Sequence, residues 1–429
     1  MKRSSLRFVL LAMLALLTAG VAAMCSGDSD SFYSASKAEL SAGAAGTVIR
    51  AQEIPAFDGA KAWRVLYRST GLKGEPIAVS GIVVAPEAAS AASEHPVVAW
   101  AHPTTGIATK CAPSLGSDVV KTIPGVDAMV RQGFVVAATD YVGLGTAGPH
   151  PYLIGVSAAR SMLDSVRAAR AVTPAGPQFA VWGHSQGGHA VLWAGKLASD
   201  YAPDIKLVGV AAAAPPTDLA TLLEDDLTTP AGQAFTALTL LSWSRVFGID
   251  LGTIVHREAL RYVDWIGNEC MTNPFDLFID ELAMHGLKRE FLKGNPAKAQ
   301  PWQKLILENT PNDLPPHIPL LITQGRNDGL ILPAIYPGLR GPVLPSGGCC
   351  VGDRDGFGPS GDREGQRRGC GRMDGGSVCG SAGAEHLRCR GEVVRGLFLR
   401  PRAKALLNLA VLPRERLPAG LVVAGETAV

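Results

Sequence analysis

The chain has 429 residues, of which 47% are hydrophobic and 18% are charged, and its formal net charge at pH 7 is +2. This composition is too apolar for a disordered chain, and the length suffices for one large domain or two. The near-neutral charge balance gives no argument for binding to nucleic acid, so we expect no nucleic-acid partner.

The amino-terminal segment predicts export. A basic start is followed by a sixteen-residue apolar run from Phe8 to Ala23, which is short for a membrane-spanning helix. We therefore predict a signal peptide over residues 1–23 and a secreted or cell-envelope location. Lipid anchoring at Cys25 is the alternative, although Met24 stands where a small residue is expected. The polar residues 24–50 are predicted to form a flexible lead-in.

Short apolar runs of strand length then recur between turn residues. Two stretches, 157–172 and 186–201, instead carry apolar residues at helical spacing. Because buried strands that alternate with helices form a mostly parallel sheet covered on both faces, we predict an α/β fold. The first two runs have no helical pattern between them, which predicts an antiparallel start. The strand candidates are 63–69, 77–86, 96–102, 133–140, 178–183, 206–214 and 318–325.

Residues 216–313 interrupt this alternation. They carry amphipathic helical patterns with no strand candidate between them. We predict a helical cap inserted over the carboxyl edge of the sheet, with the core formed by residues 51–215 and 314–337. The apolar faces of the cap either pack as core or form a mobile lid that makes transient contact with lipid surfaces.

The pentapeptide Gly-His-Ser-Gln-Gly at 183–187 fits the pattern G-x-S-x-G. It lies between the predicted strand 178–183 and the predicted helix 186–201. In that context the glycines permit a crowded turn that lifts the serine hydroxyl above the sheet. The sequence therefore predicts that Ser185 is a nucleophile.

An acyl-transfer nucleophile needs hydrogen-bond donors where negative charge develops on the carbonyl oxygen. One donor is expected to be the backbone N–H of Gln186, directly after the serine. The second is expected from the loop Trp-Ala-His-Pro-Thr-Thr-Gly at 100–106, which follows another predicted strand. Thr104 or Thr105 is the candidate. The alternative is an ordinary threonine-rich turn.

Asp328 follows the predicted strand 318–325 within the segment QGRNDGLILP. An acid at that place can orient a histidine and stabilise its imidazolium form, the third role of a catalytic triad. A structural Asn-Asp-Gly turn is the alternative, because these residues also favour turns.

Taken in chain order, the segments HPTTG, CAPS, TDYVGLG, HPYLIG, GHSQGGHA and QGRNDGLILP resemble the secretory lipase family of the α/β-hydrolase superfamily. The resemblance covers about residues 51–336. It implies an α/β-hydrolase fold with a helical cap, and hydrolysis of triacylglycerols or other carboxylic esters outside the cell. It further implies Ser185 as nucleophile, Asp328 as acid and a disulfide between Cys111 and Cys270. No metal or organic cofactor is implied.

The histidine of the triad is not found at its expected place. The chain order in this fold is serine, acid, histidine, and of nine histidines only His386 follows Asp328. His184 and His189 flank the nucleophile and are not expected to be oriented by Asp328. In the resembling family the base lies about thirty residues after the acid in an Asp-His pair. Here that region, 352–365, contains no histidine.

The composition also changes abruptly in residues 338–429. Seventeen glycines lie between 338 and 396, and from Pro337 onward there are thirteen arginines, one lysine and no Trp or Tyr. This is typical of a GC-rich gene translated out of frame. The codons allowed for residues 357–361 can encode Ser-Asp-His-Leu after a shift of one base. We therefore predict a frameshift near 337–339 and a hidden histidine near position 359, with a divergent tail that uses His386 as the alternative.

Two other functions remain open from the sequence. One is a non-catalytic envelope protein that binds lipid but has lost its base. The other is an acyltransferase that uses the same serine and passes the acyl group to an alcohol or amine. In each case the partner is a lipid or a small ester, and the sequence does not indicate an oligomeric state.

Overall fold

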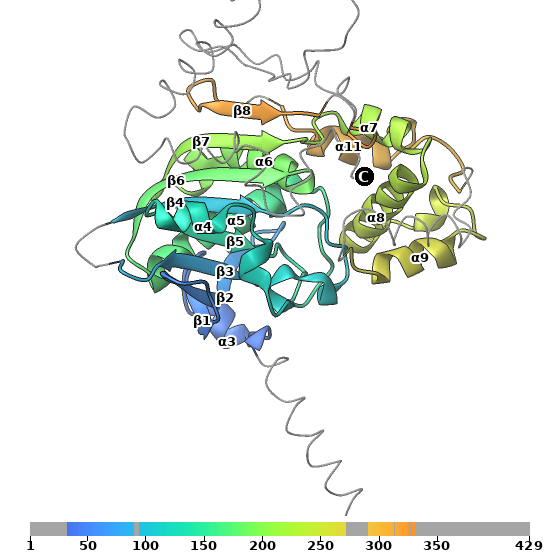
Figure 1. Ribbon diagram of the computed structural model, residues 1–429. Coiled ribbons are helices and arrows are strands. Elements are labelled where there is room, and N and C mark those ends of the chain that lie inside the picture. Colours follow the sequence, from blue (N-terminus) through green and yellow to red (C-terminus); the bar gives the residue numbers. More distant parts are fainter. Residues whose placement is uncertain (1–31, 90–93, 272–290, 313, 326–327, 332–429) are drawn as a thin grey trace, which may run out of the picture.

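The computed structural model describes residues 32–89, 94–271, 291–312, 314–325 and 328–331 (Figure 1). The predicted signal peptide, Cys25, the predicted frameshift and His386 lie outside the described residues. No helix within these ranges is long and apolar enough to span a bilayer.

A mixed sheet of eight strands forms the centre of the described structure, in the order β1-β2-β3-β5-β4-β6-β7-β8 (Figure 1). The first three strands and β5 pair antiparallel, and β5, β4, β6, β7 and β8 pair parallel. The α/β fold with an antiparallel start is thereby confirmed. The strands are Val48–Ile54 (β1), Ala60–Thr70 (β2), Pro76–Pro86 (β3), His95–Ala101 (β4), Val135–Thr139 (β5), Ala175–His184 (β6), Lys206–Ala213 (β7) and Leu320–Thr323 (β8).

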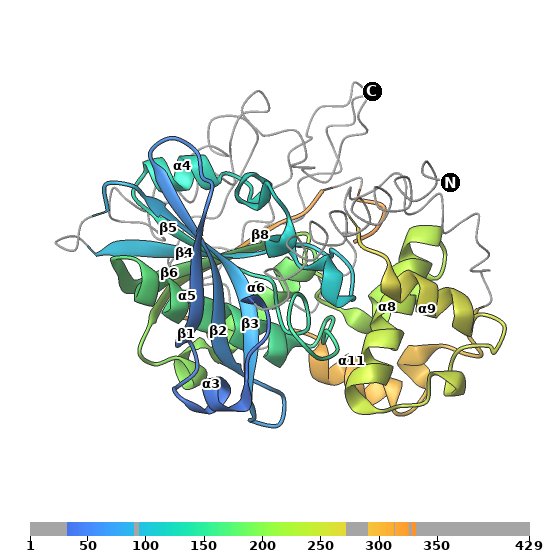
Figure 2. The same ribbon diagram turned by 90° about the horizontal axis from the view of Figure 1, so that it is seen from below.

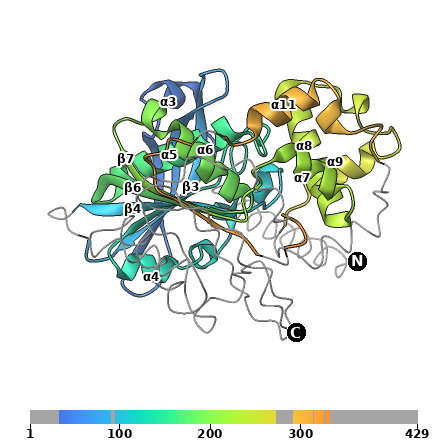
Figure 3. The same ribbon diagram turned by 90° about the horizontal axis from the view of Figure 1, so that it is seen from above.

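Helices cover both faces of the sheet (Figures 2 and 3). The helices α5 (Gly155–Val172) and α6 (Gln186–Tyr201) pack on one face and bury a large apolar cluster with strands β2 to β7. On the opposite face, α4 (Val126–Arg131) packs on β3, β4 and β5. Since the central strands are buried on both sides, they appear in the sequence as continuous apolar runs.

The described helices of the cap lie beyond the carboxyl ends of the parallel strands (Figure 1). Their apolar faces pack against one another around Trp243 and Trp302, which are fully buried, and against Tyr152 to Ile154 of the core. In the described part of the cap these faces therefore form core packing. The helices are Leu219–Asp226 (α7), Pro230–Phe247 (α8), Leu260–Asn268 (α9) and Trp302–Asn309 (α11).

The expectation of a flexible lead-in over residues 24–50 is wrong for residues 32–50. Phe32 and Tyr33 pack against the buried Leu66 of β2, and the Tyr33 hydroxyl lies 2.9 Å from Ser114 Oγ. A short helix, α3 (Lys37–Ser41), follows with a capping box in which Ser36 and Glu39 satisfy each other's backbone N–H groups. These contacts fasten the segment to the sheet.

The predicted disulfide between Cys111 and Cys270 is confirmed and joins residues 159 positions apart. Beside it, Met271 N donates a hydrogen bond to Thr105 O over 3.0 Å. Gly106 has a φ of +116°, and a Cβ there would lie 2.7 Å from the carbonyl oxygen of Glu269. The loop after β4 is therefore fastened closely to the end of the cap helix α9.

Candidate active site

Ser185 occupies the turn between β6 and α6, with φ 54° and ψ −118°. Few residues with a side chain adopt this left-handed backbone region, so the turn is strained. Two backbone hydrogen bonds hold it: Ser185 N donates to Ala213 O over 2.9 Å, and His189 N donates to Ser185 O over 3.0 Å. The sequence prediction of a serine on a tight strand-to-helix turn is thereby confirmed.

The two glycines of the pentapeptide allow this turn to fit. A Cβ on Gly187 would lie 1.9 Å from Ala101 O, and a Cβ on Gly183 would lie 2.4 Å from Gly187 O. Either methyl group would collide with backbone, which cannot move aside as a flexible side chain can. The pattern G-x-S-x-G is therefore a steric requirement of the contact between α6 and the end of β4.

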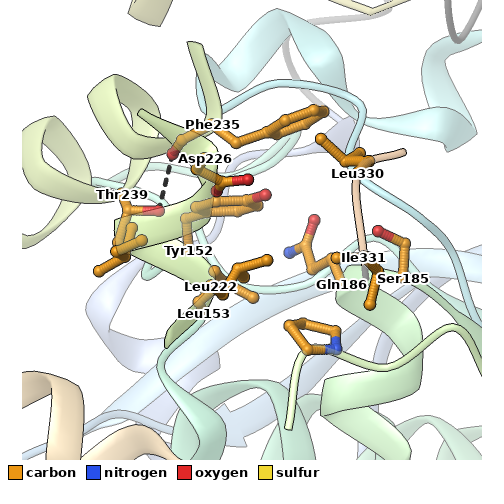
Figure 4. Close-up of a pocket in the computed structure, with 12 residues that line it drawn as sticks. Tyr152, Leu153, Ser185, Gln186, Leu222, Asp226, Phe235, Thr239, Leu330 and Ile331 are labelled. Carbon is orange, nitrogen blue, oxygen red and sulfur yellow. Dashed lines mark hydrogen bonds between the residues drawn. The ribbon is translucent and has the colours of Figure 1, made fainter. Parts of the chain in front are cut away.

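A pocket opens above Ser185, between the core and the cap (Figure 4). It contains about 370 Å³ of space, part of it open to solvent. Most of the wall is apolar, and the cap helices α7 and α8 supply much of it. The lining residues are Tyr152, Leu153, Ser185, Gln186, Pro216, Leu222, Leu223, Asp226, Phe235, Thr239, Leu330 and Ile331.

Gln186 begins α6, where the first turn of a helix leaves its N–H groups without intrahelical acceptors. Its side chain is fixed, because Nε2 lies 3.0 Å from His150 Nε2. The other ring nitrogen, Nδ1, lies 2.7 Å from Val142 O and must donate to it, so we assign Nε2 as the acceptor of the Gln186 amide. Burial lowers the pKa of His150 to about 4, which keeps the ring neutral.

The two candidate threonines of the loop after β4 differ in their surroundings. The Thr104 hydroxyl lies 2.8 Å from the Tyr152 hydroxyl at the pocket wall. The Thr105 hydroxyl is buried without a hydrogen-bond partner among the described residues. The start of this loop contacts the turn between β6 and α6, called here the serine elbow, since a Cβ on Gly187 would also meet His102 O at 2.9 Å. The loop is thus beside the turn that carries Ser185.

Asp328 lies in the turn after β8. Its Oδ1 accepts hydrogen bonds from Leu330 N (3.0 Å) and Ile331 N (2.9 Å), and its Oδ2 accepts one from Gln324 Nε2 (3.1 Å). The acid therefore shapes its own turn, as the structural alternative expected. Asp328 also lies near the end of β6: burial lowers the pKa of His184, and the nearby Asp328 carboxylate partly offsets that effect.

No histidine side chain among the described residues hydrogen-bonds to the side chain of Ser185 or Asp328. His189 instead donates from Nε2 to Asn309 O over 2.7 Å, and burial lowers its pKa to about 4. His150 is occupied by Val142 and Gln186. The described residues also contain no group of three or more His, Cys, Asp or Glu side chains that could hold a metal ion.

Sequence analysis did not find His150, Tyr152 or Asp226 as residues of the site. The first two belong to the segment HPYLIG, which was noticed only as part of a family resemblance. Asp226 lies in an amphipathic cap helix, where an acid is expected to face water. Its burial depends on packing against α8 and the core, so no local pattern could have revealed it.

The sheet order, the strained serine elbow and the cap define an α/β-hydrolase. The sequence model of the protein family described as 'Secretory lipase' matches residues 112–334, just over half of the chain. The chain therefore belongs to the secretory lipase family.

Two related sequences and one solved structure illustrate the similarity. A Mycobacterium tuberculosis protein named probable inactive lipase is 29% identical over 194 residues, covering 41% of this chain and 42% of that protein. The secreted triacylglycerol lipase LIP4 of Malassezia globosa is 27% identical over 316 residues, covering 66% of each. The chain thus spans about two fifths of the first of these relatives and just under two thirds of the second.

Among solved structures, the rice cell wall degrading esterase LipA from Xanthomonas oryzae superposes with a TM-score of 0.56. The match covers 68% of this chain and 86% of that chain at 21% identity. At this level of identity the likeness concerns the fold alone.

Proposed function

We propose that the chain is a secreted serine ester hydrolase, a lipase or carboxylesterase that works through an acyl-enzyme at Ser185. The observation that carries the proposal is the strained elbow, which presents Ser185 to a mostly apolar pocket between core and cap. Membership of the secretory lipase family supports the same chemistry.

In the proposed reaction, Ser185 Oγ attacks the ester carbonyl carbon. The backbone N–H of Gln186 and the loop with Thr104 and Thr105 stabilise the negative charge that develops on the carbonyl oxygen. A histidine oriented by Asp328 accepts the serine proton and returns it to the leaving alcohol. Water then attacks the acyl-enzyme by the same route and releases the acid.

We propose that the histidine which accepts the serine proton follows residue 331, outside the described residues. We propose that the reading frame shifts near 337–339 and that the natural base is a histidine near position 359. His386 is the alternative base in the chain as written. Resequencing the gene across codons 325 to 365 tests this directly, since one missing or extra base is expected.

The serine is tested by labelling with a fluorophosphonate probe and by hydrolysis of p-nitrophenyl butyrate. We expect labelling and turnover in the chain with the restored frame, and neither in its Ser185→Ala variant. Ser199→Ala is the matched control, because Ser199 lies on the same helix and is exposed. Full activity of Ser185→Ala, or no labelling of the restored chain, would rule out the proposed nucleophile. Adding alcohol acceptors and analysing the products separates hydrolysis from acyl transfer.

A second candidate function is a lipid-binding protein without catalysis. It is favoured because no histidine side chain within the described residues hydrogen-bonds to the side chain of Ser185 or Asp328, and because one relative is named an inactive lipase. This function predicts that the chain as written binds fatty esters without hydrolysing them. Measurable, Ser185-dependent hydrolysis of p-nitrophenyl butyrate by the chain as written would exclude it.

We also propose export with cleavage after residue 23, and transient contact of the cap with lipid surfaces. The disulfide supports an oxidising compartment, where such bonds persist. Amino-terminal sequencing of protein collected outside the expressing cells tests the cleavage. A mature chain that begins at Cys25 and carries lipid would instead indicate a lipoprotein.

A further inference from the structure

We infer that Asp226 forms a polar subsite in the cap wall of the pocket, and that this subsite binds a hydroxyl group of the ester substrate. The inference rests on the proposed function and narrows its substrate class to esters that carry a free hydroxyl group, such as partial esters of polyols.

Asp226 is the last residue of α7 and is only 4% exposed. Its neighbours in the pocket wall are apolar side chains of the cap, including Leu222, Leu223 and Phe235. Figure 4 shows its carboxyl group pointing into the pocket beside the ring of Tyr152. A carboxyl group is thus presented to a ligand from a wall that is otherwise mostly apolar.

Several other polar groups around the pocket already have partners. Thr239 Oγ1 donates to Phe235 O over 2.8 Å, and the Tyr152 hydroxyl pairs with Thr104. The Gln186 amide nitrogen is bonded to His150, whereas its Oε1 is buried without a hydrogen-bond partner among the described residues. Within the part of the chain that the structure describes, by contrast, no hydrogen bond or ion pair reaches the Asp226 carboxyl group. Its hydrogen-bonding capacity is left for a ligand.

The protonation state indicates what kind of ligand group fits. Burial raises the pKa of Asp226 well above its usual range, and the adjacent Asp225 adds to the effect. Burial therefore favours the neutral carboxylic acid, which has one O–H donor and free acceptor lone pairs. A hydroxyl group matches both functions, because it also donates and accepts.

A hydrocarbon chain in this pocket would leave the acid unpaired, whereas a hydroxyl group would satisfy it. A site built around a buried polar group rejects analogues that lack its partner more strongly than an apolar pocket rejects an extra group. We therefore expect discrimination in favour of the hydroxylated ester of about tenfold or more in kcat/KM.

Two matched pairs of esters test the subsite from either side of the scissile bond. The first pair is 1-monobutyrin and propyl butyrate, which share the acyl group and differ by two hydroxyls on the alcohol. The second pair is ethyl 3-hydroxybutyrate and ethyl butyrate. The frame-restored chain is expected to prefer the hydroxylated member of at least one pair. Equal kcat/KM values within both pairs would overturn the subsite.

Asp226→Leu is expected to reduce the preference to about one, mainly through KM, without lowering the unfolding temperature. Asp226→Asn keeps a donor and an acceptor and is expected to retain most of the preference. Glu224→Gln is the matched control, because Glu224 is an exposed acid of the same helix outside the pocket lining. A preference that survives Asp226→Leu would also overturn the subsite.

Binding separates the failure of the subsite from the failure of the proposed hydrolase. The same four esters are compared by saturation-transfer NMR with the Ser185→Ala chain and with its Asp226→Leu derivative. A binding preference that Asp226→Leu removes supports the subsite even if no ester is ever hydrolysed. Turnover without a preference in either assay keeps the hydrolase and excludes the subsite.

Discussion

Gly187 occupies the most crowded position of the elbow. Replacing it by alanine would place a Cβ 1.9 Å from Ala101 O, so the helix and the end of β4 would have to separate. We expect Gly187→Ala to lower the free energy of unfolding by about 2 kcal/mol or more, as overpacking of a rigid contact does. Urea unfolding measures this. Gly195→Ala, on the same helix with only side chains nearby, is expected to change stability far less.

His189 makes the stability of the fold depend on pH. Burial lowers its pKa to about 4, whereas an unfolded histidine titrates near 6.5. The unfolded chain therefore takes up the proton first. The stability that the neutral His189 ring contributes is fully present above about pH 6.5 and is lost as the pH falls toward 4. This loss amounts to about 3 kcal/mol in the free energy of unfolding.

We expect His189→Gln to be less stable than the unmodified chain at pH 7, because the contact with Asn309 O changes. Between pH 7 and pH 4, however, the variant should lose about 3 kcal/mol less. Urea unfolding at both pH values measures the difference. The exposed His256→Gln provides the control, and equal losses in all three proteins would contradict the assignment.

For single residues, the sequence predicts those whose place depends on a local pattern. Ser185 was placed correctly on its turn because the glycines around it are adjacent in the chain. The turn of Asp328 was likewise foreseen from its position after a strand. Asp226 was not, since its burial is produced by contacts with elements that are distant in sequence. The predicted position of the base, near residue 359, lies outside the described residues, so that prediction stays untested.

The disulfide acts on whole elements, because it joins the loop after β4 to the end of α9. Replacing Cys111 and Cys270 together by alanine is expected to lower the free energy of unfolding by about 2–5 kcal/mol, as the loss of a native disulfide does. Thermal and urea unfolding measure the change. Reductant should destabilise the unmodified chain by a similar amount and leave the double variant unaffected. Equal sensitivity to reductant would contradict this account.

The elements that the sequence predicted best are the buried ones. Strands β4 to β7 and helices α5 and α6 appear as long apolar runs or clear helical periods, because their packing repeats along the chain. The edge strand β1 was missed, since its burial pattern alternates poorly and three consecutive residues are exposed. Helices α3 and α4, of five and six residues, are too short to show a period.

For the whole molecule, the decisive prediction concerns the reading frame. Restoring it is expected to raise ester hydrolysis by about 10³-fold or more over the chain as written, because it supplies the missing base. The measurement is kcat/KM for p-nitrophenyl butyrate with both chains, and substitution of the histidine near 359 by alanine in the restored chain is the control. Equal activity of the two chains would contradict a frameshift.

The chain as written is further expected to be poorly soluble and to lack a packed core over residues 338–396. Limited proteolysis followed by mass spectrometry should find the first cleavages within that segment. Resistance of the segment to protease would show instead that this composition supports a folded tail.

The disulfide also limits how the cap can move. Peptide connections at 214–218 and 310–318 already attach the cap beside β7 and β8, and the bond between Cys111 and Cys270 adds a third attachment after β4. Three covalent connections restrict how far the cap can move relative to the sheet. The disulfide therefore restrains the distance between the end of α9 and the loop after β4, and with it the pocket between core and cap.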